Sequence, residues 1–185
     1  MSTIFDFLKE TLDESESPPD VVAHGLSGTI AALFAQQFPQ LFRSLTLISV
    51  DSISSKQWSS DYFAMRRKLP CSRSLILSHI VPLLFDNCLE DPDLLLSAFF
   101  AKCLDSNYIL GSVASHAVLP NLSLIDTPLL IINGDHDFVV GQNSKLRWKP
   151  YLKPGDRFCS VPGGHHFSHF SRPSFFGSLI NPFWE

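Results

Sequence analysis

Four short apolar runs along the chain predict the strands of a sheet. They cover residues 21–24, 45–50, 129–133 and, more weakly, 157–161. Runs that are apolar at nearly every position and alternate with helical segments are typical of parallel strands covered on both faces. The pattern therefore predicts an α/β fold whose parallel sheet has about four strands.

Helical spacing fills most of the remaining chain. An amphipathic helix is predicted over residues 2–12, a small-residue helix over 30–38 and a last helix over 173–180. The long stretch between the second and third runs has helical spacing throughout, and Asp91-Pro92 within it has the pattern of a helix start. We expect one half of the core at 1–51, an inserted helical cap at 52–123, and the rest of the core at 124–185.

Composition narrows the class of protein. The 185 residues are 45% hydrophobic and 17% charged, which is ordinary for a folded domain. A net charge of −4 without a basic block argues against a nucleic-acid partner. No apolar run is long enough to span a membrane, and the N-terminus lacks the pattern of a signal peptide. The four cysteines are widely spaced, so we expect reduced, packed thiols in a cytoplasmic protein.

The segment Gly25-Leu26-Ser27-Gly28-Thr29 lies between the first predicted strand and the next helix. A serine on such a sharp turn presents its hydroxyl at the carboxyl edge of the sheet, with small neighbours where strand and helix crowd together. Ser27 is therefore the candidate nucleophile, and the N–H of Gly28 the candidate oxyanion donor. The alternative is a glycine-rich turn in which Ser27 caps the helix.

An acidic loop follows the third predicted strand, in the sequence Asn-Gly-Asp-His-Asp at 133–137. A rigid strand fixes where such a loop begins, so Asp137 is placed to orient a catalytic imidazole. A capped Asx turn is the alternative. Asp51, which ends the second strand, is the competing acid.

A glycine-rich loop with three histidines follows the fourth predicted strand, at 162–169. His166 is the candidate general base and His165 the second choice. Zinc binding by His165, His166 and His169 is the competing interpretation, but no H-E-x-x-H motif is present, so no metal is expected. The other histidines, His24, His79 and His116, are expected to be structural or to lie in the cap.

Together, the three segments resemble the α/β-hydrolase superfamily. H-G-L-S-G-T-I-A is similar to its nucleophile elbow, P-L-L-I-I-N-G-D-H-D to its acid loop, and P-G-G-H-H-F-S-H-F-S-R-P to its histidine loop. In the family, an aromatic residue and then a proline follow the histidine, and Phe167 and Pro173 fit this pattern when His166 is the base. The order Ser27, Asp137, His166 also matches.

The resemblance implies a serine hydrolase that acts on an ester, thioester or related small carbonyl compound without a cofactor. Other chemistry known in the family, such as C–C bond hydrolysis or a lyase reaction, stays open. A non-catalytic hydrolase-like protein that acts by interaction is the alternative.

The chain departs from the family at its start. Family members have about four strands and a helix before the elbow, and a loop there supplies the first oxyanion N–H. Only one helix is predicted before the elbow here. Three explanations are expected, in decreasing order of preference. The protein begins upstream, another chain such as the second copy of a homodimer supplies the missing half, or activity is lost.

Overall fold

The computed structural model describes residues 2–85, 93–106 and 122–185, and its centre is a four-stranded parallel sheet. The strands are β1 (Asp20–His24), β2 (Ser44–Ile48), β3 (Leu129–Gly134) and β4 (Arg157–Val161), and they lie side by side in the order of the chain. The predicted parallel sheet is therefore confirmed. The predicted helix start at Asp91-Pro92 lies outside the described residues, as do Cys88 and His116.

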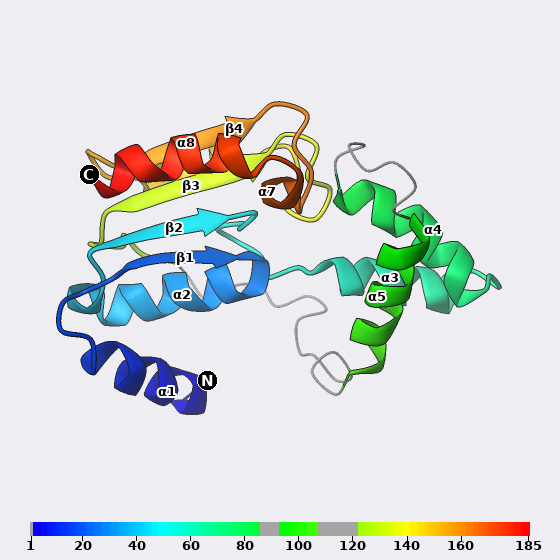
Figure 1. Ribbon diagram of the computed structural model, residues 1–185, viewed down its shortest axis with the longest axis horizontal. Coiled ribbons are helices and arrows are strands. Elements are labelled where there is room, and N and C mark those ends of the chain that lie inside the picture. Colours follow the sequence, from blue (N-terminus) through cyan, green and yellow to red (C-terminus); the bar gives the residue numbers. More distant parts are fainter. Residues whose placement is uncertain (1, 86–92, 107–121) are drawn as a thin grey trace.

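Both faces of the sheet are covered, which explains why its strands are apolar at nearly every position. Helices α1 (Ser2–Asp13) and α2 (Gly25–Gln37) lie on one face, and α8 (Pro173–Trp184) lies on the other (Figure 1). Successive side chains of a strand point to opposite faces. Leu45 and Leu47 accordingly join the core under α2, whereas Ile48 joins Phe176 of α8.

Helix α2 begins earlier than the sequence pattern predicts. It starts at Gly25, directly after β1, and not at residue 30. Gly25 has φ +54°, the left-handed conformation that favours glycine, so the sharp reversal from strand to helix takes place there. The apex of the turn is consequently residue 25, two positions before Ser27.

Gly28 allows this helix to approach the sheet closely. A Cβ at position 28 would lie 2.4 Å from Cγ2 of Val50 and 3.2 Å from the carbonyl oxygen of Ala23. Glycine at position 28 therefore permits the close packing of helix against strands for which the sequence predicts small residues at this turn.

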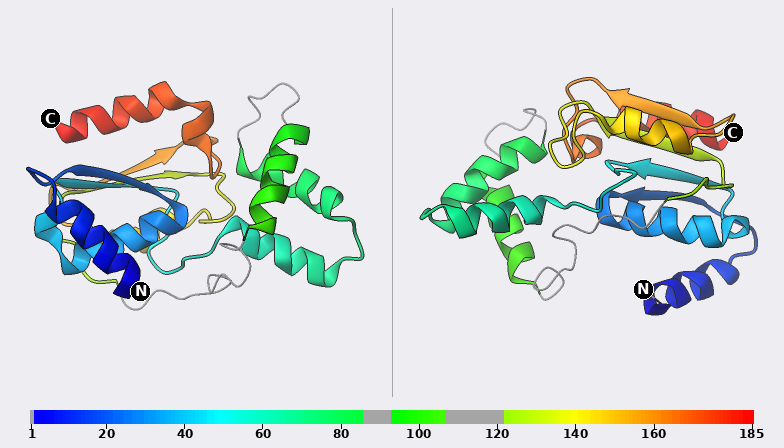
Figure 2. Two further views of the ribbon diagram at one scale, coloured as in Figure 1. Left: turned by 60° about the horizontal axis from the view of Figure 1, so that its bottom comes forward. Right: turned by 180° about the vertical axis from the view of Figure 1, so that it is seen from behind.

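A second group of helices lies beyond the carboxyl ends of the strands. It consists of α3 (Trp58–Lys68), α4 (Arg73–Leu84) and α5 (Asp93–Asp105), and Figures 1 and 2 show it beside the sheet and not over either face. These helices share a core of their own that includes Ile76 and Ile80. One contact between this group and the rest of the chain is made just after α4 by Phe85, which stacks on Phe167 with ring centroids 5.0 Å apart.

Short helices complete the fold: η1 (Pro39–Leu41), α6 (Ser144–Trp148), η3 (Lys149–Tyr151) and α7 (Ser168–Ser171). None of the described helices combines the length and apolar character that crossing a membrane requires. In the described part of the chain, Cys71, Cys103 and Cys159 carry free thiols.

We predict that Gly28→Ala lowers the free energy of unfolding by about 1–3 kcal/mol, because the added methyl group overlaps Val50. The measurement is urea denaturation followed by circular dichroism. Gly177→Ala, inside α8, is the matched control, because nothing lies within 4 Å of the added Cβ. Since alanine favours a helix more than glycine does, the free energy of unfolding should be unchanged or up to about 1 kcal/mol higher. Equal losses in the two variants would contradict the packing role of Gly28.

Candidate active site

The carboxyl edge of the sheet brings together the loops that follow β1, β3 and β4. The acid loop and the histidine loop are in direct contact, because a Cβ at Gly134 would lie 2.0 Å from the carbonyl oxygen of Gly164. The N–H of His136 donates to that same oxygen at 3.0 Å. This approach between two glycines places Asp137 beside His166.

Asp137 and His166 form a buried hydrogen-bonded pair. Nδ1 of His166 lies 2.9 Å from Oδ2 of Asp137, and the two residues are 4% and 1% exposed, respectively. The second carboxylate oxygen of Asp137 accepts the N–H groups of Val139 at 2.9 Å and Val140 at 3.1 Å. Of the sequence-predicted site residues, these two are the ones that the structure joins.

The surroundings of Asp137 keep its carboxylate ionised. Burial alone raises the pKa of Asp137, but the hydrogen bond and charge of His166, the N–H of Val140 and the side chain of Ser49 outweigh it and lower the pKa below its usual value. An ionised carboxylate only accepts hydrogen bonds, so Nδ1 of His166 carries a proton. In the neutral imidazole, Nε2 is then left with a lone pair.

Two side chains hold the backbone of His166. Its carbonyl oxygen accepts hydrogen bonds from Nε2 of His24 at 2.9 Å and from Oγ of Ser49 at 2.8 Å. Ser49 adopts φ +54°, which costs a non-glycine residue about 1–2 kcal/mol. The strained residue lies just after β2 and is 4% exposed, and its side chain connects that strand to the histidine loop.

Two further imidazoles, those of His24 and His169, lie beside the pair. The ring centroid of His24 lies 4.8 Å from that of His166 and 4.7 Å from that of His169. Burial, followed by the nearby charge of His166, lowers the pKa of His24 to about 4, and the same causes lower the pKa of His169. His24 is therefore neutral at pH 7 with its proton on Nε2, since it donates to a carbonyl oxygen. The expected structural role of His24 agrees with these contacts.

Gly25, and not Ser27, faces the free side of His166. A Cβ at position 25 would lie 3.7 Å from Nε2 of His166 and 4.0 Å from its Cε1. The hydroxyl of Ser27 is exposed and donates instead to the carbonyl oxygen of His24 at 2.8 Å. Among the described residues, no hydrogen bond joins Ser27 to the Asp137–His166 pair. The expectation that Ser27 lies at the apex of the turn was therefore wrong.

Because α2 begins earlier than predicted, the N–H groups available as oxyanion donors differ from the predicted one. Because α2 begins at Gly25 with His24 as its N-cap, the N–H of Gly28 faces the His24 carbonyl as the first bond within the helix. The N–H groups of Gly25, Leu26 and Ser27 precede that bond and have no partner within the helix. These first-turn groups, and not Gly28, are the donors available at the site.

The competing residues have other partners. Oδ1 of Asp51 accepts Nε of Arg147 at 2.7 Å, so this acid forms an ion pair and does not orient a histidine. Nδ1 of His165 lies 3.1 Å from the carbonyl oxygen of Leu83, at the end of α4. In the described part of the chain, no three histidine, cysteine, aspartate or glutamate side chains are grouped as metal ligands would be.

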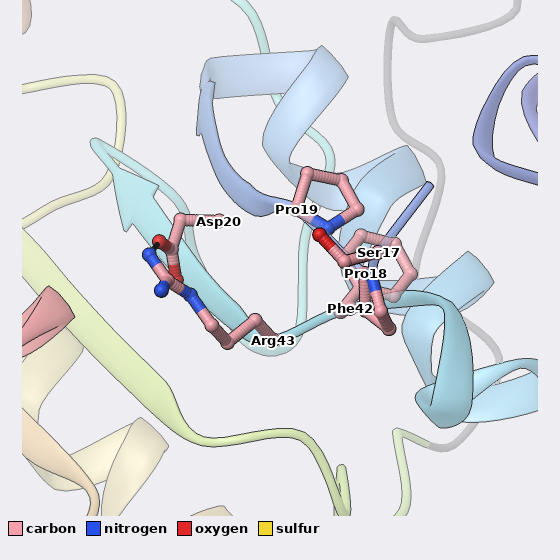
Figure 3. Close-up of a pocket in the computed structure, with 6 residues that line it drawn as sticks. All are labelled: Ser17, Pro18, Pro19, Asp20, Phe42 and Arg43. Carbon is pink, nitrogen blue, oxygen red and sulfur yellow. Dashed lines mark ion pairs between the residues drawn. The ribbon is translucent and has the colours of Figure 1, made fainter. Parts of the chain in front are cut away.

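A pocket of about 510 Å³ lies at the opposite, amino end of the strands (Figure 3). Its charged residues, Asp20 and Arg43, are the first residue of β1 and a neighbour of β2, and they pair with each other. Asp20 also accepts the hydroxyl of Ser44 at 2.5 Å. Because these charges are already paired, we do not assign this pocket to the chemistry.

Two cyanobacterial proteins are similar to the chain over nearly its whole length, although no protein-family model matches it. An uncharacterized protein of Nostoc sp. is 30% identical over 180 residues, which cover 97% of this chain and 72% of that protein. An uncharacterized protein of Synechocystis sp. is 30% identical over 184 residues, covering 97% and 71%, respectively.

Solved hydrolase structures share the fold. A thermophilic esterase superposes with a TM-score of 0.77 at 16% identity, over 97% of this chain and 70% of its own. The meta-cleavage product hydrolase of Pseudomonas fluorescens superposes with a TM-score of 0.73 at 15% identity, over 99% and 71%. At these identities the likeness concerns the fold.

We predict that the partly buried His24 makes stability depend on pH between about 6.5 and 4. The folded chain keeps His24 neutral down to about pH 4, whereas unfolding exposes it to protonation near its ordinary pKa of 6.5. The unfolded state therefore binds more protons in this window, and stability falls as the pH falls. Lowering the pH from 7 to 4.5 should cost about 2 kcal/mol from His24 alone.

Urea denaturation at the two pH values measures this loss. His24→Gln should reduce the difference, whereas His79→Gln, at an exposed position, should leave it unchanged. A pH difference as large in His24→Gln as in the unaltered chain would contradict the assignment.

Proposed function

The chain belongs to the α/β-hydrolase superfamily, and on that basis we propose that it hydrolyses an ester, thioester or related carbonyl substrate with the Asp137–His166 pair as its base. The observation that carries the proposal is the 2.9 Å hydrogen bond between two almost fully buried side chains, with Nε2 of His166 directed at the turn before α2. A general base oriented by an ionised carboxylate is the arrangement that acyl transfer requires.

In this proposal, Asp137 holds the imidazole in one tautomer and stabilises the cation that forms when Nε2 takes a proton. The first-turn N–H groups of α2 face the same side of the turn, where the positive end of the helix dipole favours a developing oxyanion. The hydroxyl of Ser27 is given no catalytic role, because it is bound to the His24 carbonyl.

The substrate is expected to enter between the sheet edge and the α3–α5 helices. Those helices reach the histidine loop, since the N–H of Phe167 donates to the carbonyl oxygen of Leu84 at 2.8 Å. We keep the organisation expected from the sequence, with a core at 1–51 and 124–185 and a cap at 52–123. The cap then forms an apolar roof over a carbonyl compound. No cofactor is needed for this chemistry.

A non-catalytic role is the second candidate, and one observation favours it: Gly25, the residue beside Nε2 of His166, has no side-chain nucleophile. β1 is also an edge of the described sheet, with Val22 43% exposed, and such an edge is a surface for pairing with another chain. This candidate predicts a dimer in light scattering and no turnover that depends on His166.

We predict that His166→Ala lowers kcat/KM for p-nitrophenyl butyrate by roughly 10²–10⁴-fold, since it removes the general base. Asp137→Asn should also reduce the rate, because an amide donor at this position favours the wrong imidazole tautomer. The measurement is initial rates at pH 7.5 on the full chain, with folding checked by circular dichroism.

His165→Ala is the matched control, since it removes the neighbouring histidine and leaves the pair intact; its rate should stay within about twofold of the unaltered chain. If His165→Ala and His166→Ala were equally impaired, or neither were impaired, the proposed base would be wrong.

A further inference from the structure

We infer that the attacking nucleophile is a water molecule bound between Gly25 and Nε2 of His166, and that no acyl-enzyme forms. The inference rests on the proposed hydrolase function and adds the identity of its nucleophile. It follows from three features: the conformation of Gly25, the orientation of His166 and the hydrogen bond of Ser27.

Gly25 occupies the position from which a side chain would meet the base. Its φ of +54° places it at the apex between β1 and α2, and a Cβ there would lie 3.7 Å from Nε2 of His166. A hydroxyl one bond beyond that Cβ would come within hydrogen-bonding reach of Nε2. Glycine leaves that volume to a molecule the size of water.

His166 is prepared to accept a proton from this direction. It is 4% exposed, its Nδ1 is engaged by Asp137, and among the described residues Nε2 has no hydrogen-bond partner. A buried imidazole whose Nε2 carries a free lone pair, directed at the amino end of a 13-residue helix, marks a site for a small polar molecule. The helix supplies N–H donors from Leu26 and Ser27 for the substrate's carbonyl oxygen.

The reaction balances with water as the only co-reactant. The water oxygen forms a bond to the carbonyl carbon while Nε2 of His166 takes one of its protons, and the negative charge develops on the former carbonyl oxygen. The tetrahedral intermediate then breaks its bond to the alcohol or thiol. That leaving group receives the proton from His166, and the products are a carboxylic acid and an alcohol or thiol.

Ser27 is unsuited to the alternative, in which a covalent intermediate forms on its hydroxyl. Residues 25 and 27 are about 200° apart around the helix axis, so they point in opposite directions. The Ser27 hydroxyl is exposed and bonded to the His24 carbonyl.

Gly25→Ser tests the assignment by supplying the missing side chain. We expect a fluorophosphonate to label Gly25→Ser at residue 25 on the order of 100-fold faster than it labels the unaltered chain. Peptide mapping by mass spectrometry locates the adduct, and the label should disappear in Gly25→Ser combined with His166→Ala. Gly155→Ser is the matched control: it makes the same change at another left-handed glycine, where nothing lies within 4 Å, and should not label.

Acid quenching during turnover of p-nitrophenyl butyrate tests the reaction itself. The unaltered chain should show no acyl adduct by intact mass, on Ser27 or on any other residue. An adduct on Ser27, or absence of label on a folded Gly25→Ser, would overturn the inference while leaving the hydrolase function in place. If no turnover depends on His166, the proposed function is wrong instead. The labelling of Gly25→Ser then tests separately whether residue 25 lies beside Nε2 of His166.

Discussion

The loops at the carboxyl edge of the sheet depend on one interaction, the hydrogen bond between Asp137 and His166. A carboxylate that is 1% exposed is tolerated because two backbone N–H groups and an imidazole surround it. The imidazole is in turn fixed through its own backbone, whose carbonyl oxygen is held by His24 from β1 and Ser49 from the end of β2. One buried charge thus connects the loops of all four strands.

The fold was predictable because each strand is a separate, nearly continuous apolar run, and burial on both faces leaves that signal in the sequence. Asp137 and His166 were found for a related reason. Both follow the end of a strand, and the carboxyl ends of parallel strands meet at one edge. Their hydrogen bond then depends on the approach of Gly134 to Gly164, a contact between distant segments that local patterns do not reveal.

The error at the elbow has a local cause. The true start of α2 has no recognisable cap, since its N-cap is His24 and that side chain makes no capping hydrogen bond. Ser27, flanked by small residues, was the stronger signal of a turn, and it shifted the predicted helix start by five residues. The sequence A-H-G-L-S-G also allows the turn to reverse at its first glycine, and φ +54° shows that it does so. Ser49 was missed because nothing local marks a serine for the left-handed conformation.

The contact between Gly134 and Gly164 also bears on the cooperativity of the fold. With no side chain on either residue, the acid loop and the histidine loop are packed backbone to backbone, and a hydrogen bond from His136 crosses between them. Neither loop can open alone without exposing a buried charge. The edge of the sheet should therefore open as one unit with the strands beneath it, so exchange of the His136 amide hydrogen reports on unfolding of the core and not on local loop motion.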